Sequence, residues 1–244
     1  MNKSKLKSFI DSRASQFLEH FAASEEKYTA IWDIYSERMP GCVRSCRARK
    51  CRYGSNTGFE GPQGIHWIGK HPKIMFLGRE NYGWYESKTW GTGKESICFA
   101  PLEFTFFTAE SMGGYWAKIR SIAVDVLELG DSNWEGILKN IAVSNGSKCY
   151  SDSGAYLRWM HLACIQQRYV EDEIRIVRAP MNVLFSKSVG IAKSLFAGNA
   201  SIEFQDTDFL VLKLGDQILI ECAHPVRKSD EWLEQLKTKI RTYL

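Results

Sequence analysis

Two polar segments of the chain follow directly after short apolar runs, and both carry side chains suited to acid–base chemistry. Glu80 and Asn81 follow the run from Ile74 to Gly78, and His224 follows a run that begins at Gln217. A carboxylate can position and activate a water molecule, and an imidazole can stabilise negative charge on a departing group. Open α/β sheets present reactive groups at the carboxyl ends of their strands, so we predict that the two segments meet there in one site.

Cysteine spacing indicates a second kind of chemistry, because five of the seven cysteines suit a metal centre. Cys42, Cys46 and Cys51 lie in one arginine-rich segment, close enough for their thiolates to converge on one metal. Cys149 and Cys164 are separated by 14 residues. This pair and two of the first three cysteines can supply the four thiolates of a [4Fe–4S] cluster or of a zinc site. Which two take part stays open, and a solvated basic loop with incidental cysteines is the alternative.

The spacing of apolar residues predicts strands that alternate with helices. The predicted strands are Ile74–Leu77, Ile137–Val143, Met181–Phe185, Phe209–Leu214 and Gln217–Ala223. The predicted helices are Lys5–Phe21, Glu25–Glu37, Tyr115–Leu129, Leu157–Val170, Val189–Phe196 and a last helix, capped by Ser229, whose apolar face is Trp232, Leu233, Leu236, Ile240 and Leu244. Such alternation predicts an α/β fold of three layers, αβα, with a central, mainly parallel sheet of about four strands. We assign residues 1–40 to a helical N-terminal extension and residues 41–244 to the α/β domain.

The composition is that of an ordinary globular protein, with 44% hydrophobic and 25% charged residues. A net charge of +4 permits an anionic partner without requiring one. We see no N-terminal export signal, and no apolar run approaches the roughly 18–20 residues of a membrane-spanning helix. We therefore expect a cytoplasmic protein, a monomer, with no membrane contact.

An ordered series of short features along the chain resembles a known superfamily. The series comprises the cysteines of residues 42–51, the strand that ends at Gly78 before the Glu80 loop, Asn145 four residues before Cys149, Cys164, the apolar strand Asn182–Phe185, and His224-Pro225 before the last helix. In this order the features resemble the uracil-DNA glycosylase superfamily, closest to its iron–sulfur branch, from about residue 42 to about residue 240. Family members carry Gly-Glu-Ala-Pro-Gly or a similar sequence after the first strand. This chain has the longer, proline-free segment Gly78–Gly83 instead, so the resemblance predicts a divergent member.

The resemblance implies a uracil-DNA glycosylase-like fold and a DNA-repair hydrolase that removes uracil or a related damaged base. The implied partner is DNA, single-stranded or uracil-containing, and the implied cofactor is a [4Fe–4S] cluster. Glu80 or Asn81 would position the attacking water, and His224 would donate a hydrogen bond to the carbonyl oxygen of the departing base. The amide of Asn145 would read the edge of a pyrimidine.

Further residues of the implied site would enclose the base and hold the DNA. A base must leave the helical stack to be reached, so an aromatic lid is expected. The lid would be Phe99, with Tyr82 or Trp84 as rivals, beside the backbone of Gly78. Arg227 and Lys228 follow His224-Pro225 and would hold phosphates.

Each of these assignments has a simpler alternative. His224 can be an interior histidine, Asn145 can cap the turn before Gly146, and Glu80 can form a surface ion pair with Arg79 or Arg52. Two other functions also fit the sequence. The chain can hold a nucleic acid or nucleotide without cleaving it, or it can be a metal-stapled scaffold for protein contacts.

Overall fold

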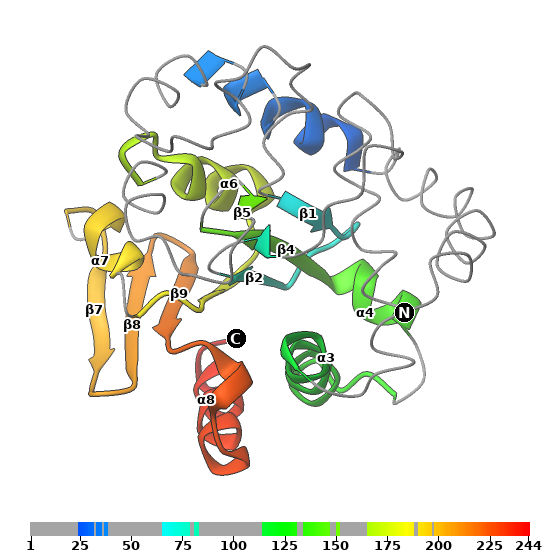
Figure 1. Ribbon diagram of the computed structural model, residues 1–244, viewed down its shortest axis with the longest axis vertical. Coiled ribbons are helices and arrows are strands. Elements are labelled where there is room, and N and C mark those ends of the chain that lie inside the picture. Colours follow the sequence, from blue (N-terminus) through cyan, green and yellow to red (C-terminus); the bar gives the residue numbers. More distant parts are fainter. Residues whose placement is uncertain are drawn as a thin grey trace.

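The computed structural model describes the backbone of residues 24–31, 33–35, 37–38, 65–78, 81–82, 114–130, 134–146, 150–151, 165–187, 190–196 and 198–244. Within these ranges, no helix is both long and apolar enough to cross a membrane. The elements form a central sheet with helices on its two faces, which confirms the predicted α/β class (Figure 1).

The central sheet has seven strands in the order β1-β4-β2-β6-β9-β8-β7. The strands are β1 (Ile65–Ile68), β2 (Ile74–Gly78), β4 (Ile141–Asn145), β6 (Met181–Leu184), β7 (Ser201–Gln205), β8 (Phe209–Leu214) and β9 (Gln217–Cys222). Strands β4, β2, β6 and β9 are parallel neighbours, whereas β1, β8 and β7 pair antiparallel. A separate pair, β3 (Asn81–Tyr82) and β5 (Tyr150–Ser151), forms just beyond β2 and β4.

The predicted count of about four strands is therefore wrong, because the sheet is mixed and larger. Its parallel centre does hold four strands, but three antiparallel strands extend its edges. Two of the three were hard to see in the sequence. The exposed edge strand β7 has no apolar run, and β1 lies in a glycine-rich segment that resembles a loop.

One boundary prediction fails in the middle of the chain. The range Ile137–Val143 was expected to be a strand, but its first half belongs to helix α4 (Trp134–Asn140), and β4 begins only at Ile141. The side-chain amide of Asn140 donates to the carbonyl of Gly136, which closes the last turn of this helix. Apolar runs of this length do not distinguish a buried helix from a buried strand.

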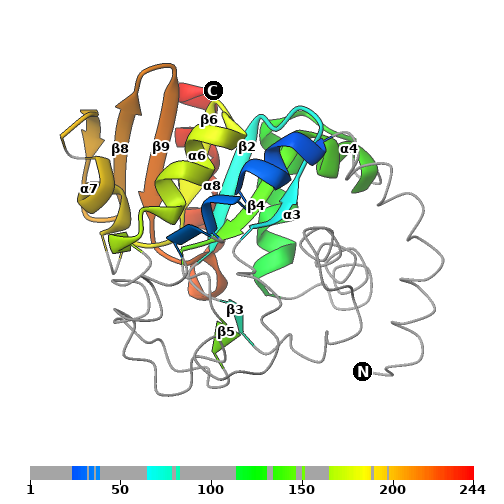
Figure 2. The same ribbon diagram turned by 90° about the horizontal axis from the view of Figure 1, so that it is seen from above.

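Helices α6 (Tyr169–Val177) and α7 (Ile191–Phe196) cover one face of the sheet, together with the helical residues 24–31, 33–35 and 37–38 (Figure 2). Tyr28, Ile31 and Tyr35 of this N-terminal stretch are fully buried in the same core cluster as Met75 and Leu77 of β2. The Tyr28 hydroxyl accepts a hydrogen bond from the backbone N–H of Ile68, at 2.7 Å. The stretch thus shares the core of the α/β sheet.

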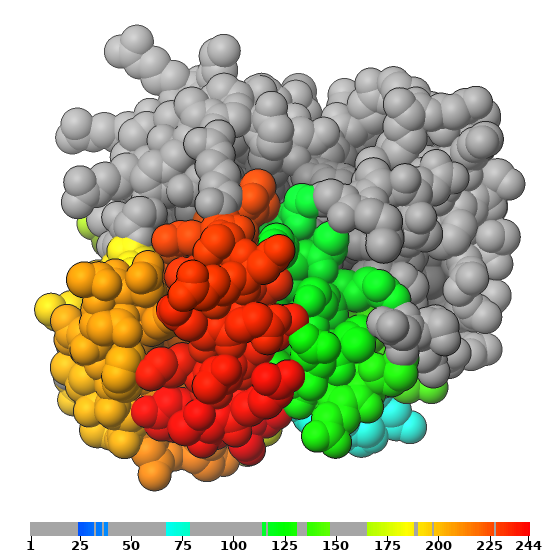
Figure 3. Space-filling view, turned by 90° about the horizontal axis from the view of Figure 1, so that it is seen from below, coloured from blue at the N-terminus to red at the C-terminus, as the bar shows by residue number. Residues whose placement is uncertain are grey.

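Helices α3 (Tyr115–Val126) and α8 (Asp230–Tyr243) lie side by side across the opposite face (Figure 3). Lys118 of α3 pairs with Asp230 of α8 at 2.9 Å, and the buried Lys237 of α8 contacts Asp125 of α3. Ser229 caps α8 as predicted, because its hydroxyl accepts from the Trp232 N–H. Of the predicted apolar face only Leu244 is misplaced, since it is 46% exposed.

Candidate functional site

The carboxyl ends of four adjacent strands form a row on the α3 and α8 face of the sheet. Asn145 of β4 lies opposite Gly78 of β2. The register then continues through Phe185, just after β6, to Cys222 at the end of β9, because Leu77 pairs with Leu184 and Leu184 with Glu221. Neighbouring strands are roughly 4.8 Å apart, so the row from Asn145 to Cys222 spans about 14 Å.

Gly78 and Asn145 touch at one end of this row. The amide oxygen of Asn145 occupies the space that a Cβ atom on residue 78 would need. The backbone N–H of Gly146 donates to the Gly78 carbonyl at 2.8 Å and so fixes the two strand ends together. Only a glycine allows this approach, and the nearly buried Asn145 side chain is held against the backbone of β2.

Tyr115, the first residue of α3, connects this end of the row with the imidazole of His224. Its ring stacks on the His224 ring with centroids 5.0 Å apart and meets the Phe185 ring edge-on at 5.7 Å. Its buried hydroxyl oxygen lies 3.3 Å from the Cβ position of residue 78, on the same side as the Asn145 amide. Burial raises the pKa of the phenol well above its ordinary value, and the neighbouring Cys222 adds to the shift, so the ring is neutral.

His224 follows β9 and begins the short helix η2 (Pro225–Arg227). Its Nδ1 accepts a long hydrogen bond from the backbone N–H of Val226 at 3.5 Å, which favours the tautomer with the proton on Nε2. The side chain is only partly buried. The arrangement presents a hydrogen-bond donor at the edge of the sheet, where it can stabilise developing negative charge.

Two serine–glutamate pairs support the strand ends from the opposite face. The Ser144 hydroxyl donates to Glu173 at 2.6 Å, and the Ser186 hydroxyl donates to Glu221 at the same distance. Burial raises the pKa of Glu173 well above its ordinary value. Glu221 also accepts from the backbone N–H of Ala192, which ties α7 to the sheet. These pairs fix the strands directly beside Asn145 and Phe185.

The described residues bring together three of the predicted site residues and leave others undescribed. Gly78, Asn145 and His224 share one face and one edge of the sheet, with Tyr115 between the amide and the imidazole. Lys228 lies four residues beyond His224, on the same edge. Glu80, Phe99, Trp84 and the five candidate metal ligands Cys42, Cys46, Cys51, Cys149 and Cys164 lie outside the described residues, and only the backbones of Asn81, Tyr82 and Arg227 are described.

The backbone pairing still places the Asn81 segment. Asn81 and Tyr82 pair in parallel with Tyr150 and Ser151, so the loop after β2 runs beside the segment that follows Asn145. In the part of the chain that the structure describes, no group of three or more His, Cys, Asp or Glu side chains is arranged to hold a metal ion.

The sequence interpretation missed Tyr115, Phe185 and Cys222 as parts of the site. Phe185 and Cys222 could have been found from the period of two along a strand, because Phe185 directly follows buried strand β6 and Cys222 ends buried strand β9, both on the face that His224 shares. Tyr115 had no such signal, since it lies at the start of a helix and not at the end of a strand.

Comparison of the chain with models of known protein families and with curated protein sequences finds no match in either case. The function proposed next therefore rests on the geometry of the residues themselves and on the ordered sequence features.

Proposed function

We propose that the protein is a DNA base-excision glycosylase, which hydrolyses the N-glycosidic bond of uracil or a related damaged base. The observation that carries the proposal is the convergence of the Asn145 amide and the His224 imidazole at one sheet edge, joined by the ring of Tyr115. These two residues are nearly 80 positions apart in the sequence, and both had been assigned to one site from the sequence.

The imidazole of His224 matches the chemistry of base departure. When the bond to the sugar breaks, negative charge gathers on the carbonyl oxygens of the base. A hydrogen bond from His224 Nε2 stabilises this charge more in the transition state than in the ground state, and only such differential binding accelerates the reaction. The N–H of Val226 favours this tautomer, because it occupies Nδ1.

The amide of Asn145 supplies base recognition. It combines a donor and an acceptor in one plane, which a pyrimidine edge requires. Its fixed position against Gly78 gives the amide a defined direction before the base arrives. Glu80, which lies between β2 and β3 in the sequence, or Asn81, the first residue of β3, would position the water that attacks the sugar. Tyr115 and Phe185 would supply the aromatic walls for an extruded base.

The test is a single-turnover assay on single- and double-stranded oligonucleotides that contain one uracil. Purified protein is expected to leave alkali-labile abasic sites at the uracil position. His224→Ala and Asn145→Ala should each slow cleavage by about 10²-fold or more, because each removes a transition-state or positioning contact. Lys213→Ala, an exposed change at the opposite edge of the sheet, should not alter the rate. Absence of excision from any uracil-containing or deaminated substrate contradicts the proposal.

A non-catalytic nucleic-acid- or nucleotide-binding function is the second candidate. It is favoured by the stacking of Tyr115 on His224, since the ring already covers one face of the imidazole that catalysis would use. Under this alternative the same edge binds a base and releases it intact. Salt-dependent DNA binding without cleavage supports it, and efficient uracil excision rules it out.

A further inference from the structure

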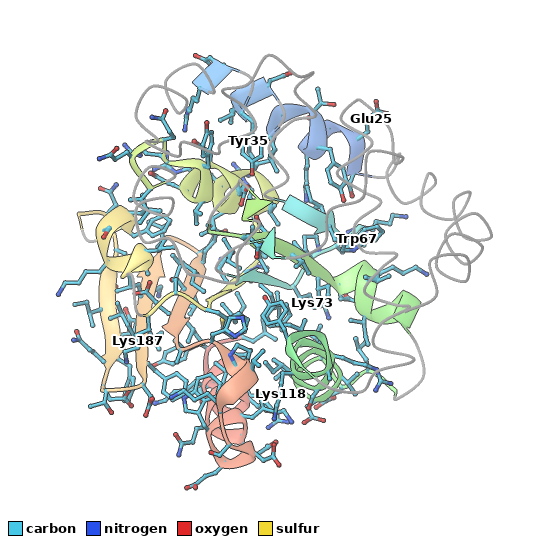
Figure 4. All side chains as sticks on the ribbon, viewed as in Figure 1. Glu25, Tyr35, Trp67, Lys73, Lys118 and Lys187 are labelled. Atoms are coloured by element: carbon cyan, nitrogen blue, oxygen red, sulfur yellow. The ribbon has the colours of Figure 1, made fainter. Side chains whose placement is uncertain are left out.

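Two lysines from separate loops meet at one turn beside the end of β9. Lys187 follows β6, and its backbone N–H donates to the Cys222 carbonyl at 3.1 Å. Its ammonium group donates to the Asp206 carbonyl, also at 3.1 Å. The ammonium of Lys228, which lies just after η2, approaches the Asp208 carboxylate at 3.4 Å. Both ammonium groups therefore contact the turn of residues 206–208. Figure 4 labels Lys187 beside strand β8.

The turn that receives the two lysines is firmly built. The Asp206 carboxylate accepts from the backbone N–H groups of Asp208 and Phe209, at 2.7 and 2.6 Å. Phe209 lies opposite Cys222 in the antiparallel pair of β8 and β9. The turn is thus fixed at the sheet edge where β9 ends. His224 follows Cys222 by two residues at this edge, so the two lysines lie next to the candidate site.

The contact between Lys228 and Asp208 is a weak one. The side chains are 33% and 43% exposed, and the 3.4 Å separation is longer than that of a tight ion pair. Exposed pairs of this kind contribute at most about 1 kcal/mol to stability. The Lys228 ammonium also lies 5.4 Å from the Trp232 ring centroid, which restricts its side chain to this region. An anion that binds the Lys228 ammonium more tightly than the Asp208 carboxylate can therefore replace this contact without disturbing the fold.

An electrostatic effect on the intervening thiol agrees with this placement. Burial raises the pKa of Cys222, and the charge of Glu221 raises it further, but Lys187 and Lys228 both act to lower it. Both ammonium charges therefore act on the residue that ends β9, although they come from different loops.

We propose that Lys187 and Lys228 form a phosphate-binding site at the edge of the candidate base site, in which Asp208 competes with the phosphate for Lys228. Naming the backbone phosphodiester of DNA as the ligand rests on the proposed function, whereas the site itself does not. Two ammonium groups held by separate loops can contact adjacent oxygens of one phosphate or two successive phosphates of a strand. Lys228 had been assigned to phosphate from the sequence, but Lys187 and the competing carboxylate had not.

The test measures binding rather than cleavage, on a fluorescently labelled single-stranded oligonucleotide without uracil, at several salt concentrations. Lys187→Gln and Lys228→Gln should each weaken binding several-fold and lower the slope of log K against log salt by about 0.7. Asp208→Asn should strengthen binding, because it removes the competitor. The matched control is Lys213→Gln, since Lys213 is exposed near the opposite end of β8 and should leave the slope unchanged.

The outcomes separate this site from the proposed function. A loss of slope in both lysine variants, with unchanged thermal stability, supports the site even if no uracil is ever excised. Unchanged binding in Lys187→Gln, or an equal loss in Lys213→Gln, overturns it. A second arm adds inorganic phosphate as competitor. Displacement of the oligonucleotide by phosphate only in proteins that retain Lys187 places both ligands at this site and supports it. Phosphate binding that depends on Lys187 but does not affect the oligonucleotide assigns the site to free phosphate or a small phosphorylated ligand, and this overturns the choice of DNA backbone.

Discussion

The amide oxygen of Asn145 lies over the α-carbon of Gly78, directly across the parallel pair of β2 and β4. The Tyr115 hydroxyl approaches the same point from α3, at 3.3 Å from the position of a Cβ atom on residue 78. Two distant parts of the chain, at Asn145 and Tyr115, therefore meet over Gly78, which has no side chain. The direction of the amide depends on the absence of that side chain.

Gly78→Ala should displace the Asn145 amide, because the new methyl group overlaps its oxygen. Forced overpacking of this kind costs about 1–3 kcal/mol of unfolding free energy. We expect a lower urea midpoint and a loss of base excision that exceeds the loss of stability. Gly130→Ala is the control, since a Cβ at residue 130 meets no atom within 4 Å. Equal activity of the Gly78→Ala and Gly130→Ala variants contradicts the importance of this contact.

Tyr115 is expected to orient His224 through its flat ring. Tyr115→Phe retains the ring and should keep the excision rate within about tenfold of the parent rate. Tyr115→Leu retains apolar volume but removes the stacking partner 5.0 Å from the imidazole, so the rate should fall by about 10²-fold. Single-turnover rates and thermal unfolding, measured together, separate misorientation from loss of fold. A fully active Tyr115→Leu variant excludes an orienting role.

The sequence predicted the strand ends that carry the candidate site better than it predicted the number of strands in the sheet. Strand β9 and the histidine beyond it were readable, because a short apolar run bounded by Gly215 and Pro225 is typical of a buried strand. Strand β7 was not readable, since its residues are mostly exposed and its stability comes from pairing with β8. Helix α4, directly before β4, was missed because a short apolar run has no period that distinguishes a buried helix from a buried strand.

Only the site residues that strands position could be predicted from the sequence. Asn145 ends strand β4 and His224 follows strand β9, so topology alone brings them to one edge. Tyr115 reaches them through the packing of α3 under β2 and β9, and packing of side chains from distant elements leaves no local pattern in a sequence. The same holds for Lys187, whose position depends on the bond of its backbone N–H to Cys222.

The predicted cluster has its own test, which does not depend on excision. Protein purified without oxygen should be brown and should contain about four iron atoms per chain if four thiolates hold a [4Fe–4S] cluster. Cys149→Ser and Cys164→Ser should each lower the iron content and the visible absorbance, whereas Cys98→Ser, outside the predicted ligand set, should not. Zinc without iron would assign the same ligands to a zinc site, and a colourless protein without either metal contradicts the prediction.

Glu173 should make the protein less stable as the pH rises. Its carboxyl is buried beside the Ser144 hydroxyl, and burial raises its pKa well above the ordinary value of 4.5. In the unfolded chain this group ionises near 4.5, so above that pH the folded state holds one more proton than the unfolded state. The free energy of unfolding then falls with increasing pH, by at most about 1.4 kcal/mol per pH unit, until the raised pKa is reached.

Glu173→Gln removes this titration and keeps a hydrogen-bonding group of the same shape beside Ser144. The difference in unfolding free energy between parent and variant, measured by urea denaturation from about pH 5 upward, should therefore change in favour of the variant until the pH reaches the raised pKa of Glu173. Glu203→Gln, on the exposed edge strand β7, provides the control and should show no such trend. A constant difference between the parent and the Glu173→Gln variant across this range would mean that the Glu173 carboxyl ionises at its ordinary pKa within the fold.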